Sequence, residues 1–117
     1  MKNKVVLFVD DEKSLYECIE TYFDKEIVMW LRNGEESLRA MDYFNKIIKI
    51  VFVDYDMPGL NGVEVIKEIR QKGYKHKVYM LSGNSSIKNT ALKVGADGFI
   101  EKPFDLGVLE GLVGEGG

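Results

Sequence analysis

Five side chains that could do chemistry follow short apolar runs of the sequence. Asp10 and Asp11 come directly after the first run, and Asp54 follows the run IVFV. Ser82 comes after a third run and Lys102 after a fourth. Short apolar runs are typical of strands that are buried on both faces of a parallel sheet. Because open α/β sheets bind ligands outside the carboxyl ends of their strands, these five side chains are candidates for one site.

The three carboxylates need a positive partner if they meet. Two carboxylates about 4 Å apart repel by roughly 4 kcal/mol at an effective dielectric of 20. Lys102 supplies only one positive charge, and an oxygen-rich ligand set suits Mg²⁺, which keeps several waters and uses one or two carboxylates. We predict Asp11 and Asp54 as direct Mg²⁺ ligands and Asp10 as a partner reached through a water. The backbone carbonyl of Asp56, on the turn past the strand, is the further predicted ligand.

These groups together describe a site for phosphoryl transfer. Asp54 would attack phosphorus, while the metal and Lys102 would neutralise the phosphoryl oxygens. Ser82 would donate its hydroxyl to the phosphoryl group once it is attached. Taken singly the residues have simpler interpretations: Asp10 and Asp11 could cap a helix, and Ser82 could be an ordinary loop residue.

Strand and helix patterns alternate five times along the chain, which predicts a parallel sheet covered by helices on both faces. The expected strands cover residues 4–9, 27–31, 47–53, 78–81 and 98–100. Right-handed crossovers then place all the strand ends at one edge, so alternation alone gathers the five side chains. We expect residues 1–117 to form a single domain, since the chain is too short for two.

Capping residues predict where the helices begin and end. Asn61 with Glu64, and Asn33 with Glu36, have the spacing of N-cap pairs. Gly73 is the expected end of the third helix. The last helix, with Leu106, Leu109 and Val113 directed inward, is expected to be weak, because glycine costs about 1 kcal/mol relative to alanine inside a helix. Its glycines are Gly107, Gly111 and Gly114.

Composition limits the partners and the compartment. A net charge of -3 and a pI near 5.2 predict no direct nucleic acid binding. No apolar run approaches the roughly 20 residues that span a bilayer, so we expect no membrane insertion. The single cysteine, Cys18, indicates a cytoplasmic location and is expected in the core. His76, in a basic run, is expected to face solvent.

Taken together, these motifs closely resemble the receiver domain of bacterial two-component response regulators, over nearly the whole chain. The acidic pair, DYDMPGLNG, the LSG triplet and GFIEKPF occur in the family's order and spacing. The resemblance implies a flavodoxin-like, doubly wound, five-stranded parallel sheet of order 2-1-3-4-5 with five surrounding helices. It also implies a cis bond between Lys102 and Pro103.

The resemblance implies a phosphorelay function as well. A histidine kinase or phosphotransfer protein would pass a phosphoryl group to Asp54 with the help of Mg²⁺, and the protein would slowly lose it without being a turnover enzyme. Phe99 would be the switch residue that turns inward when the phosphoryl group draws the loop of Ser82 toward it. The surface of the fourth helix, fifth strand and fifth helix would then present a changed face to an unidentified downstream protein.

Three other functions stay open at this point. The segment VFVDYD also resembles the nucleophile strand of haloacid-dehalogenase-type phosphatases, although the chain is short for that class. An FMN carrier of flavodoxin type would need a phosphate loop where the sequence has Asp10, Asp11 and Glu12, which would repel phosphate. A receiver that is never phosphorylated, working as a constitutive interaction module, is the third. The chain could also be part of a longer regulator with an output domain.

Overall fold

Five parallel strands form one sheet in the order β2-β1-β3-β4-β5, the order that the resemblance to receiver domains implies. The computed structural model describes residues 4–23 and 26–116. The strands are β1 (Val5–Val9), β2 (Ile27–Leu31), β3 (Ile48–Asp54), β4 (Lys77–Ser82) and β5 (Gly98–Glu101). The helices are α1 (Lys13–Tyr22), α2 (Gly34–Phe44), α3 (Gly62–Gln71), α4 (Lys88–Lys93) and α5 (Leu106–Gly116), with a 3₁₀ turn, η1 (Ser85–Ile87), before α4.

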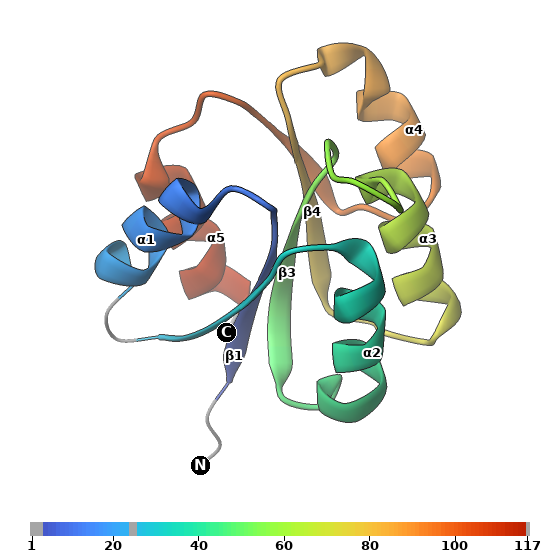
Figure 1. Ribbon diagram of the computed structural model, residues 1–117, viewed down its shortest axis with the longest axis horizontal. Helices are drawn as coiled ribbons and strands as arrows, with labels where there is room; N and C mark the ends of the chain where they lie inside the picture. Colours follow the sequence, from blue (N-terminus) through green and yellow to red (C-terminus); the bar gives the residue numbers. More distant parts are fainter. Residues whose placement is uncertain (1–3, 24–25, 117) are drawn as a thin grey trace.

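The helices cover the two faces of the sheet in two layers. Helices α1 and α5 lie on one side, and α2, α3 and α4 lie on the other (Figure 1). Strand β1 is buried at every position because it lies between β2 and β3 and under helices on both faces. The continuous apolar run of β1 follows from that position, since each of its faces meets a helical layer.

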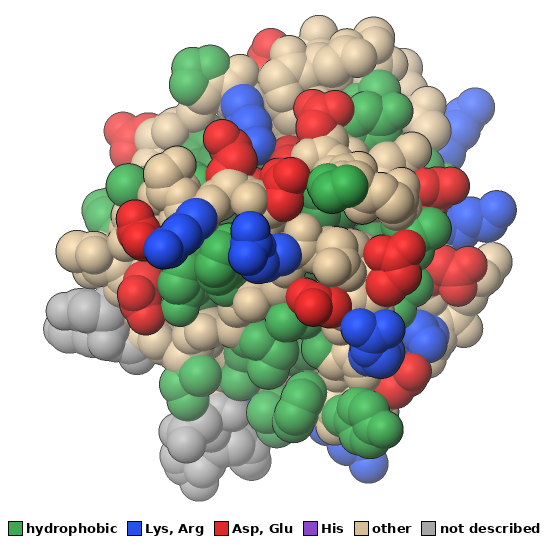
Figure 2. Space-filling view, viewed as in Figure 1, with side chains coloured by type: hydrophobic (Ala, Val, Ile, Leu, Met, Phe, Trp, Pro, Cys, Tyr) green, Lys and Arg blue, Asp and Glu red, His purple; other side chains and the backbone are tan. Residues whose placement is uncertain are grey.

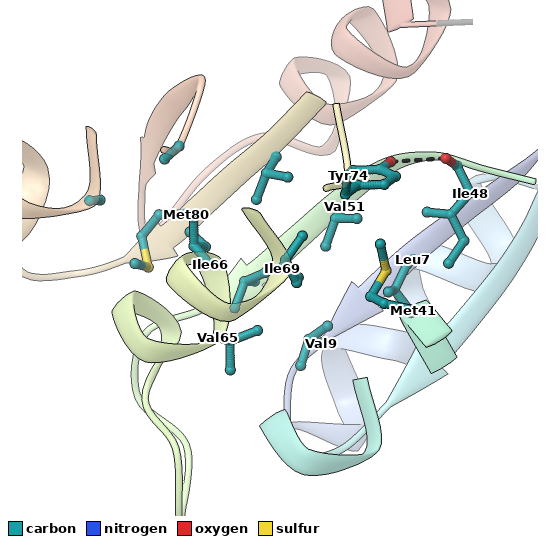
Figure 3. Close-up of a cluster of buried hydrophobic side chains, with 14 of the residues drawn as sticks. Leu7, Val9, Met41, Ile48, Val51, Val65, Ile66, Ile69, Tyr74 and Met80 are labelled. Carbon is teal, nitrogen blue, oxygen red and sulfur yellow. Dashed lines mark hydrogen bonds between the residues drawn. The ribbon is translucent and has the colours of Figure 1, made fainter. Parts of the chain in front are cut away.

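Two apolar cores fill the space between the sheet and these layers. The first joins β1, β3 and β4 to α2, α3 and α4. Ten of its side chains are labelled in Figure 3, and Tyr74 donates a hydrogen bond of 2.9 Å to the carbonyl of Ile48 across it. Burial raises the pKa of the Tyr74 hydroxyl, so this group stays a donor. The second core lies under α1 and α5 and contains the stacked pair Phe8 and Phe52.

The predicted helix caps are present. Asn61 accepts from the backbone N–H of Glu64, and the Glu64 carboxylate accepts from the N–H of Asn61. This reciprocal pair fixes the start of α3, a few residues after β3 ends. Asn33 likewise accepts from the N–H of Glu36 at 2.9 Å. Gly73 has a φ of +92°, a left-handed conformation that ends the third helix as expected.

Helix α5 forms despite its glycines. Leu109 and Val113 are buried, as predicted, whereas Leu106 is only partly buried against the same core. The carboxylate of Asp105 caps the helix by accepting from the N–H of Gly107 at 2.9 Å. Tyr22 of α1 donates a hydrogen bond to Glu110, which joins the two helices of this layer. Packing against the sheet therefore supplies the stability that the sequence of α5 lacks.

One prediction about the core is wrong. Cys18 is exposed, because it lies on α1 beside the buried stripe, toward a hollow between α1 and the loop after β5. His76 is exposed, and the Lys102–Pro103 bond is cis, as expected. Within residues 4–23 and 26–116, no helix has the length and apolar character that crossing a bilayer requires.

Candidate functional site

The acidic side chains of β1 and β3 meet at one edge of the sheet. Val9 pairs with Val53 in the parallel register, so Asp10 and Asp54 leave their strands side by side. Carboxylate oxygens of Asp10, Asp11 and Asp54 all lie within 4.8 Å of one another. Figure 2 shows acidic side chains gathered over this edge, where β1 and β3 end in Figure 1.

Asp10 and Asp54 are nearly inaccessible, with exposed fractions of 1% and 2%, whereas Asp11 is exposed. Asp10 is held in place by its neighbours: its N–H donates to Leu31, and its Oδ1 accepts from the N–H of Glu12 at 2.8 Å. The cluster thus has a rigid, buried floor and an open side at Asp11.

Lys102 is the cation of the cluster. Its Nζ lies 2.9 Å from Asp54 Oδ1, 3.6 Å from Asp10 Oδ2 and 3.4 Å from Glu12 Oε1. Its backbone N–H donates to the carbonyl of Ser82, which ties the loop after β5 to the end of β4. Three carboxylates therefore share one ammonium group.

Burial and charge change the ionisation of these groups. Burial raises the pKa of Asp54 to about 6; the charges of Asp10 and Asp56 add to the rise, and Lys102 opposes it. Burial also raises the pKa of Asp10. For Lys102, burial lowers the pKa, but the neighbouring carboxylates outweigh this effect and the net shift is upward. The cluster is short of positive charge at neutral pH.

Two buried oxygens of the cluster accept no hydrogen bond. They are Asp10 Oδ2 and Asp54 Oδ1, which form ion pairs with Lys102 Nζ at 3.6 Å and 2.9 Å. A buried polar atom without a hydrogen-bond partner costs free energy, and a bound cation would satisfy it. Oxygen ligands at this spacing, with an exposed side at Asp11, fit a hard cation such as Mg²⁺. Asp56 is exposed and follows Asp54 on the adjoining turn.

The hydroxyl of Ser82 lies at the end of the neighbouring strand. In β4, Leu81 pairs with Asp54, so Ser82 follows one position beyond that carboxylate. Ser82 is fully buried, and its Oγ accepts from the N–H of Asn84 at 3.0 Å, which leaves its hydroxyl hydrogen free to turn. The side chain of Asn84 caps η1.

Phe99 occupies β5, next to β4. It pairs with Met80 and is partly buried against the core under α3 and α4. The structure thus brings four predicted side chains into contact, while Ser82 and Phe99 lie on the strands alongside. The four are Asp10, Asp11, Asp54 and Lys102.

Two residues near the cluster were not among the predicted site residues. One is Glu12, which belongs to the acidic loop after β1 and pairs with Lys102. Its position directly after Asp10 and Asp11 is the feature of the sequence that indicates a place near the cluster. The other is Trp30 of β2, whose Nε1–H donates a 2.6 Å hydrogen bond to the carbonyl of Asp10. No feature of the sequence indicated that contact, because it depends on the pairing of β1 with β2.

The sheet order and the edge site define a doubly wound α/β protein of the flavodoxin-like class. A family model for the response regulator receiver domain matches residues 6–113. The chain therefore belongs to the receiver domains of two-component response regulators, which are signalling modules and not turnover enzymes.

Curated relatives agree with this assignment. The transcriptional regulatory protein CiaR of Streptococcus pneumoniae is 30% identical over 112 residues, covering 92% of this chain and 48% of the relative. The response regulator SaeR of Staphylococcus aureus is 31% identical over 103 residues, covering 85% of this chain and 44% of the relative. The chain thus spans about half the length of the curated relatives it matches.

Solved structures have the same fold. The receiver domain of the Francisella response regulator 1452 has a TM-score of 0.87 and 28% identity, covering 97% of this chain and 96% of that one. A chain of the CheX–CheY–BeF3–Mg²⁺ complex from Borrelia burgdorferi has a TM-score of 0.84 and 27% identity, with 96% and 88% covered.

Proposed function

We propose that this receiver domain accepts a phosphoryl group on Asp54. The observation that carries the proposal is the contact of 2.9 Å between Lys102 Nζ and Asp54 Oδ1, at the mouth of the sheet. Asp54 is an oxygen nucleophile on a rigid strand end, and Lys102 is positioned to neutralise charge on the oxygens of an incoming phosphoryl group.

Mg²⁺ fits the same cluster, because two buried carboxylate oxygens there have no hydrogen-bond partner. Asp11 and Asp54 would hold the ion directly, Asp10 through a water, and Asp56 through its backbone carbonyl. The bound ion supplies positive charge that neutralises the phosphoryl oxygens during transfer. The BeF3 and Mg²⁺ in the Borrelia burgdorferi complex support this assignment, since a chain of that complex has the same fold.

The proposed output is a change in the surface around β5. The free hydroxyl hydrogen of Ser82 and the ammonium of Lys102 would both bind the attached group, at the ends of β4 and β5. Changing a two-state equilibrium from 1:99 to 99:1 takes about 5.5 kcal/mol. Two charge-assisted hydrogen bonds supply roughly 3–6 kcal/mol. Phe99, partly buried beside Met80, would turn further inward as the loop of Ser82 moves.

The remaining parts of the proposal concern partners and turnover. A histidine kinase or phosphotransfer protein would supply the phosphoryl group, and an unidentified downstream protein would bind the changed face. The domain would lose its own phosphoryl group slowly and act on no other substrate. The proposal includes a cytoplasmic location, which the single cysteine, Cys18, supports. It also includes a single domain over residues 1–117, which the continuous five-stranded sheet supports.

Intact-mass spectrometry after incubation with acetyl phosphate tests the proposal. We expect one added phosphoryl group that requires Mg²⁺ and is absent in Asp54→Asn. Asp56→Asn is the matched control, because it removes a carboxylate two residues away that is exposed, and it should still gain the group. An adduct that persists in Asp54→Asn would refute the assignment. Catalytic turnover of phosphorylated metabolites would instead identify a phosphatase.

A further inference from the structure

Trp30 holds the loop that carries the acidic pair. Its indole Nε1–H donates a 2.6 Å hydrogen bond to the backbone carbonyl of Asp10, which is a residue of the loop between β1 and α1. Trp30 lies in β2, opposite Phe8 in the parallel register, and its side chain reaches Asp10, the residue after the end of β1. It is the single tryptophan of the chain.

The hydrogen bond orients the peptide that joins Asp10 to Asp11. The carbonyl and the N–H of one trans peptide point in opposite directions, so fixing the carbonyl of Asp10 also fixes where the backbone of Asp11 begins. The N–H of Asp10 donates to Leu31, the neighbour of Trp30. Strand β2 therefore holds Asp10 through both of its backbone groups.

Trp30 also holds the far side of the same loop. Tyr16, in the first turn of α1, stacks on Trp30 with ring centroids 4.5 Å apart and planes inclined by 11°. The guanidinium carbon of Arg32 lies 5.5 Å from the centroid of the Trp30 ring. Trp30 thus contacts both ends of the loop: Asp10 where the loop leaves β1, and Tyr16 where α1 begins.

From these contacts we infer that Trp30 is a positioning residue for cation binding by the acidic cluster. The inference rests on the proposed function, because it assigns a role toward the proposed Mg²⁺ site. With the indole hydrogen bond present, Asp11 is held near its bound position before the ion arrives. Without it, the loop has to be ordered when the ion binds, and part of the binding free energy is lost.

A replacement that removes only the N–H tests this role. Benzothienylalanine has the shape of tryptophan but carries sulfur in place of the indole N–H, and incorporating it for tryptophan changes Trp30 alone. We expect Mg²⁺ to bind about two- to tenfold more weakly by calorimetry, the range that the loss of one hydrogen bond allows. At saturating Mg²⁺ the rate of phosphorylation by acetyl phosphate should be unchanged.

Two variants complete the design. Trp30→Phe keeps an aromatic ring but removes the donor, and should weaken Mg²⁺ binding in the same direction. Tyr16→Phe is the matched control: it keeps the ring that stacks on Trp30 and removes only a hydroxyl that binds Glu20 on the surface. Its Mg²⁺ affinity should equal that of the unsubstituted protein.

The outcomes separate this inference from the proposed function. Unchanged Mg²⁺ affinity in both Trp30 replacements, with lower stability toward urea, would mean that Trp30 only packs. A lower rate at saturating Mg²⁺ would also overturn the inference, because Trp30 would then act on the transfer step. If the unsubstituted protein binds no Mg²⁺, the proposed function fails and this inference fails with it.

Discussion

The ammonium of Lys102 and the carboxylate of Asp54 lie 2.9 Å apart, although 48 positions separate them in the sequence (102 minus 54). Each side chain stands where its strand leaves the sheet, and their contact depends on β4 lying between β3 and β5. Lys102 also faces Asp10, so it interacts with two carboxylates that are almost fully buried. This arrangement makes both the ionisation and the chemistry of Asp54 sensitive to Lys102.

Asp54→Asn should stabilise the protein at neutral pH in the absence of Mg²⁺. The pKa of Asp54 is about 6 in the folded protein, against an ordinary value of 3.8. Between these values the folded state binds more protons than the unfolded state, so stability falls as the pH rises through this window. Asparagine cannot ionise and avoids this loss. We expect Asp54→Asn to be more stable by about 1–3 kcal/mol above the window.

Urea unfolding in EDTA at pH about 4 and about 7.5 measures this effect, which should shrink at the lower pH because Asp54 is then protonated. Asp42→Asn is the control, since the side chain of Asp42 is 55% exposed and pairs only at the surface with Lys72. Its effect should stay within about 0.5 kcal/mol at both pH values. Equal stabilities of Asp54→Asn and the unsubstituted protein at neutral pH would contradict the raised pKa.

Lys102→Met should slow phosphorylation of Asp54 and raise its pKa further. The ammonium lowers the pKa of both Asp54 and Asp10, and methionine removes that charge at similar length. We expect a rate of reaction with acetyl phosphate about a hundredfold lower, the size found when a charge-stabilising group is removed from an active site. Lys88→Met serves as the control, because Lys88 is exposed and forms no ion pair with any described residue. Similar rates for the two variants would argue against the role of Lys102.

Mg²⁺ should stabilise the protein more at pH 8 than at pH 5.5, because protons compete for Asp54 below its pKa of about 6. At ten times the dissociation constant, the ion should add about 1.4 kcal/mol to the free energy of unfolding. Asp11→Asn should reduce this gain, whereas Asp56→Asn should preserve it, since only the backbone carbonyl of Asp56 is assigned to the ion. Thermal unfolding with and without Mg²⁺, at both pH values, measures the stabilisation of the unsubstituted protein and of the two variants. A gain that is independent of pH would place the ion away from Asp54.

Arg70→Lys should destabilise the fold by about 2–4 kcal/mol, since lysine cannot reproduce the contacts of the guanidinium. Arg70 donates to the carbonyls of Gly95, Tyr74 and His76 and to Asp97 at 2.8–2.9 Å. It thereby joins the end of α3 to the starts of β4 and β5.

Urea unfolding measures this loss against Arg39→Lys, which makes the same substitution at an exposed site on α2. The control should change the free energy of unfolding by less than about 0.5 kcal/mol. If the two variants lose the same stability, the four contacts of Arg70 contribute little.

Gly111→Ala and Gly114→Ala should each stabilise the protein by about 0.5–1 kcal/mol, because alanine favours the helix. A Cβ atom at either position would have no neighbouring atom within 4 Å. Gly62→Ala is the opposite case, since its Cβ would lie 2.8 Å from the carbonyl of Asp54 and from Met80 Sδ. We expect that variant to lose stability, and thermal unfolding compares all three. Stabilisation by Gly62→Ala would contradict the packing beside Asp54.

The sequence was sufficient for features that depend on local chemistry or on strand alternation. The pair Asn61 and Glu64 predicted the start of α3 because N-cap geometry involves only four successive positions. The meeting of Asp10 and Asp54 followed from parallel strands ending at one edge. Neither inference needed knowledge of how helices pack on the sheet.

Features that depend on packing between distant elements could not be predicted in this way. Cys18 has the helical spacing of the apolar residues of α1, but it lies beside the buried stripe and faces the hollow between α1 and the loop after β5. The contacts of Arg70 with three backbone carbonyls depend on loop positions that no periodicity describes. The hydrogen bond from Trp30 requires β2 to pair with β1 in the register that places Trp30 opposite Phe8.

The glycines of α5 also affect how fast the backbone amide hydrogens of this helix exchange with solvent. Its intrinsic tendency to be helical is low, so its attachment depends on Leu109 and Val113, which are buried against the sheet. Detaching α5 alone then requires less free energy than unfolding the whole domain. Its amide hydrogens should exchange with deuterium by local opening, ahead of those in β1 and β3. In each such opening, Ile100 and the apolar floor beneath α5 would become accessible for a short time.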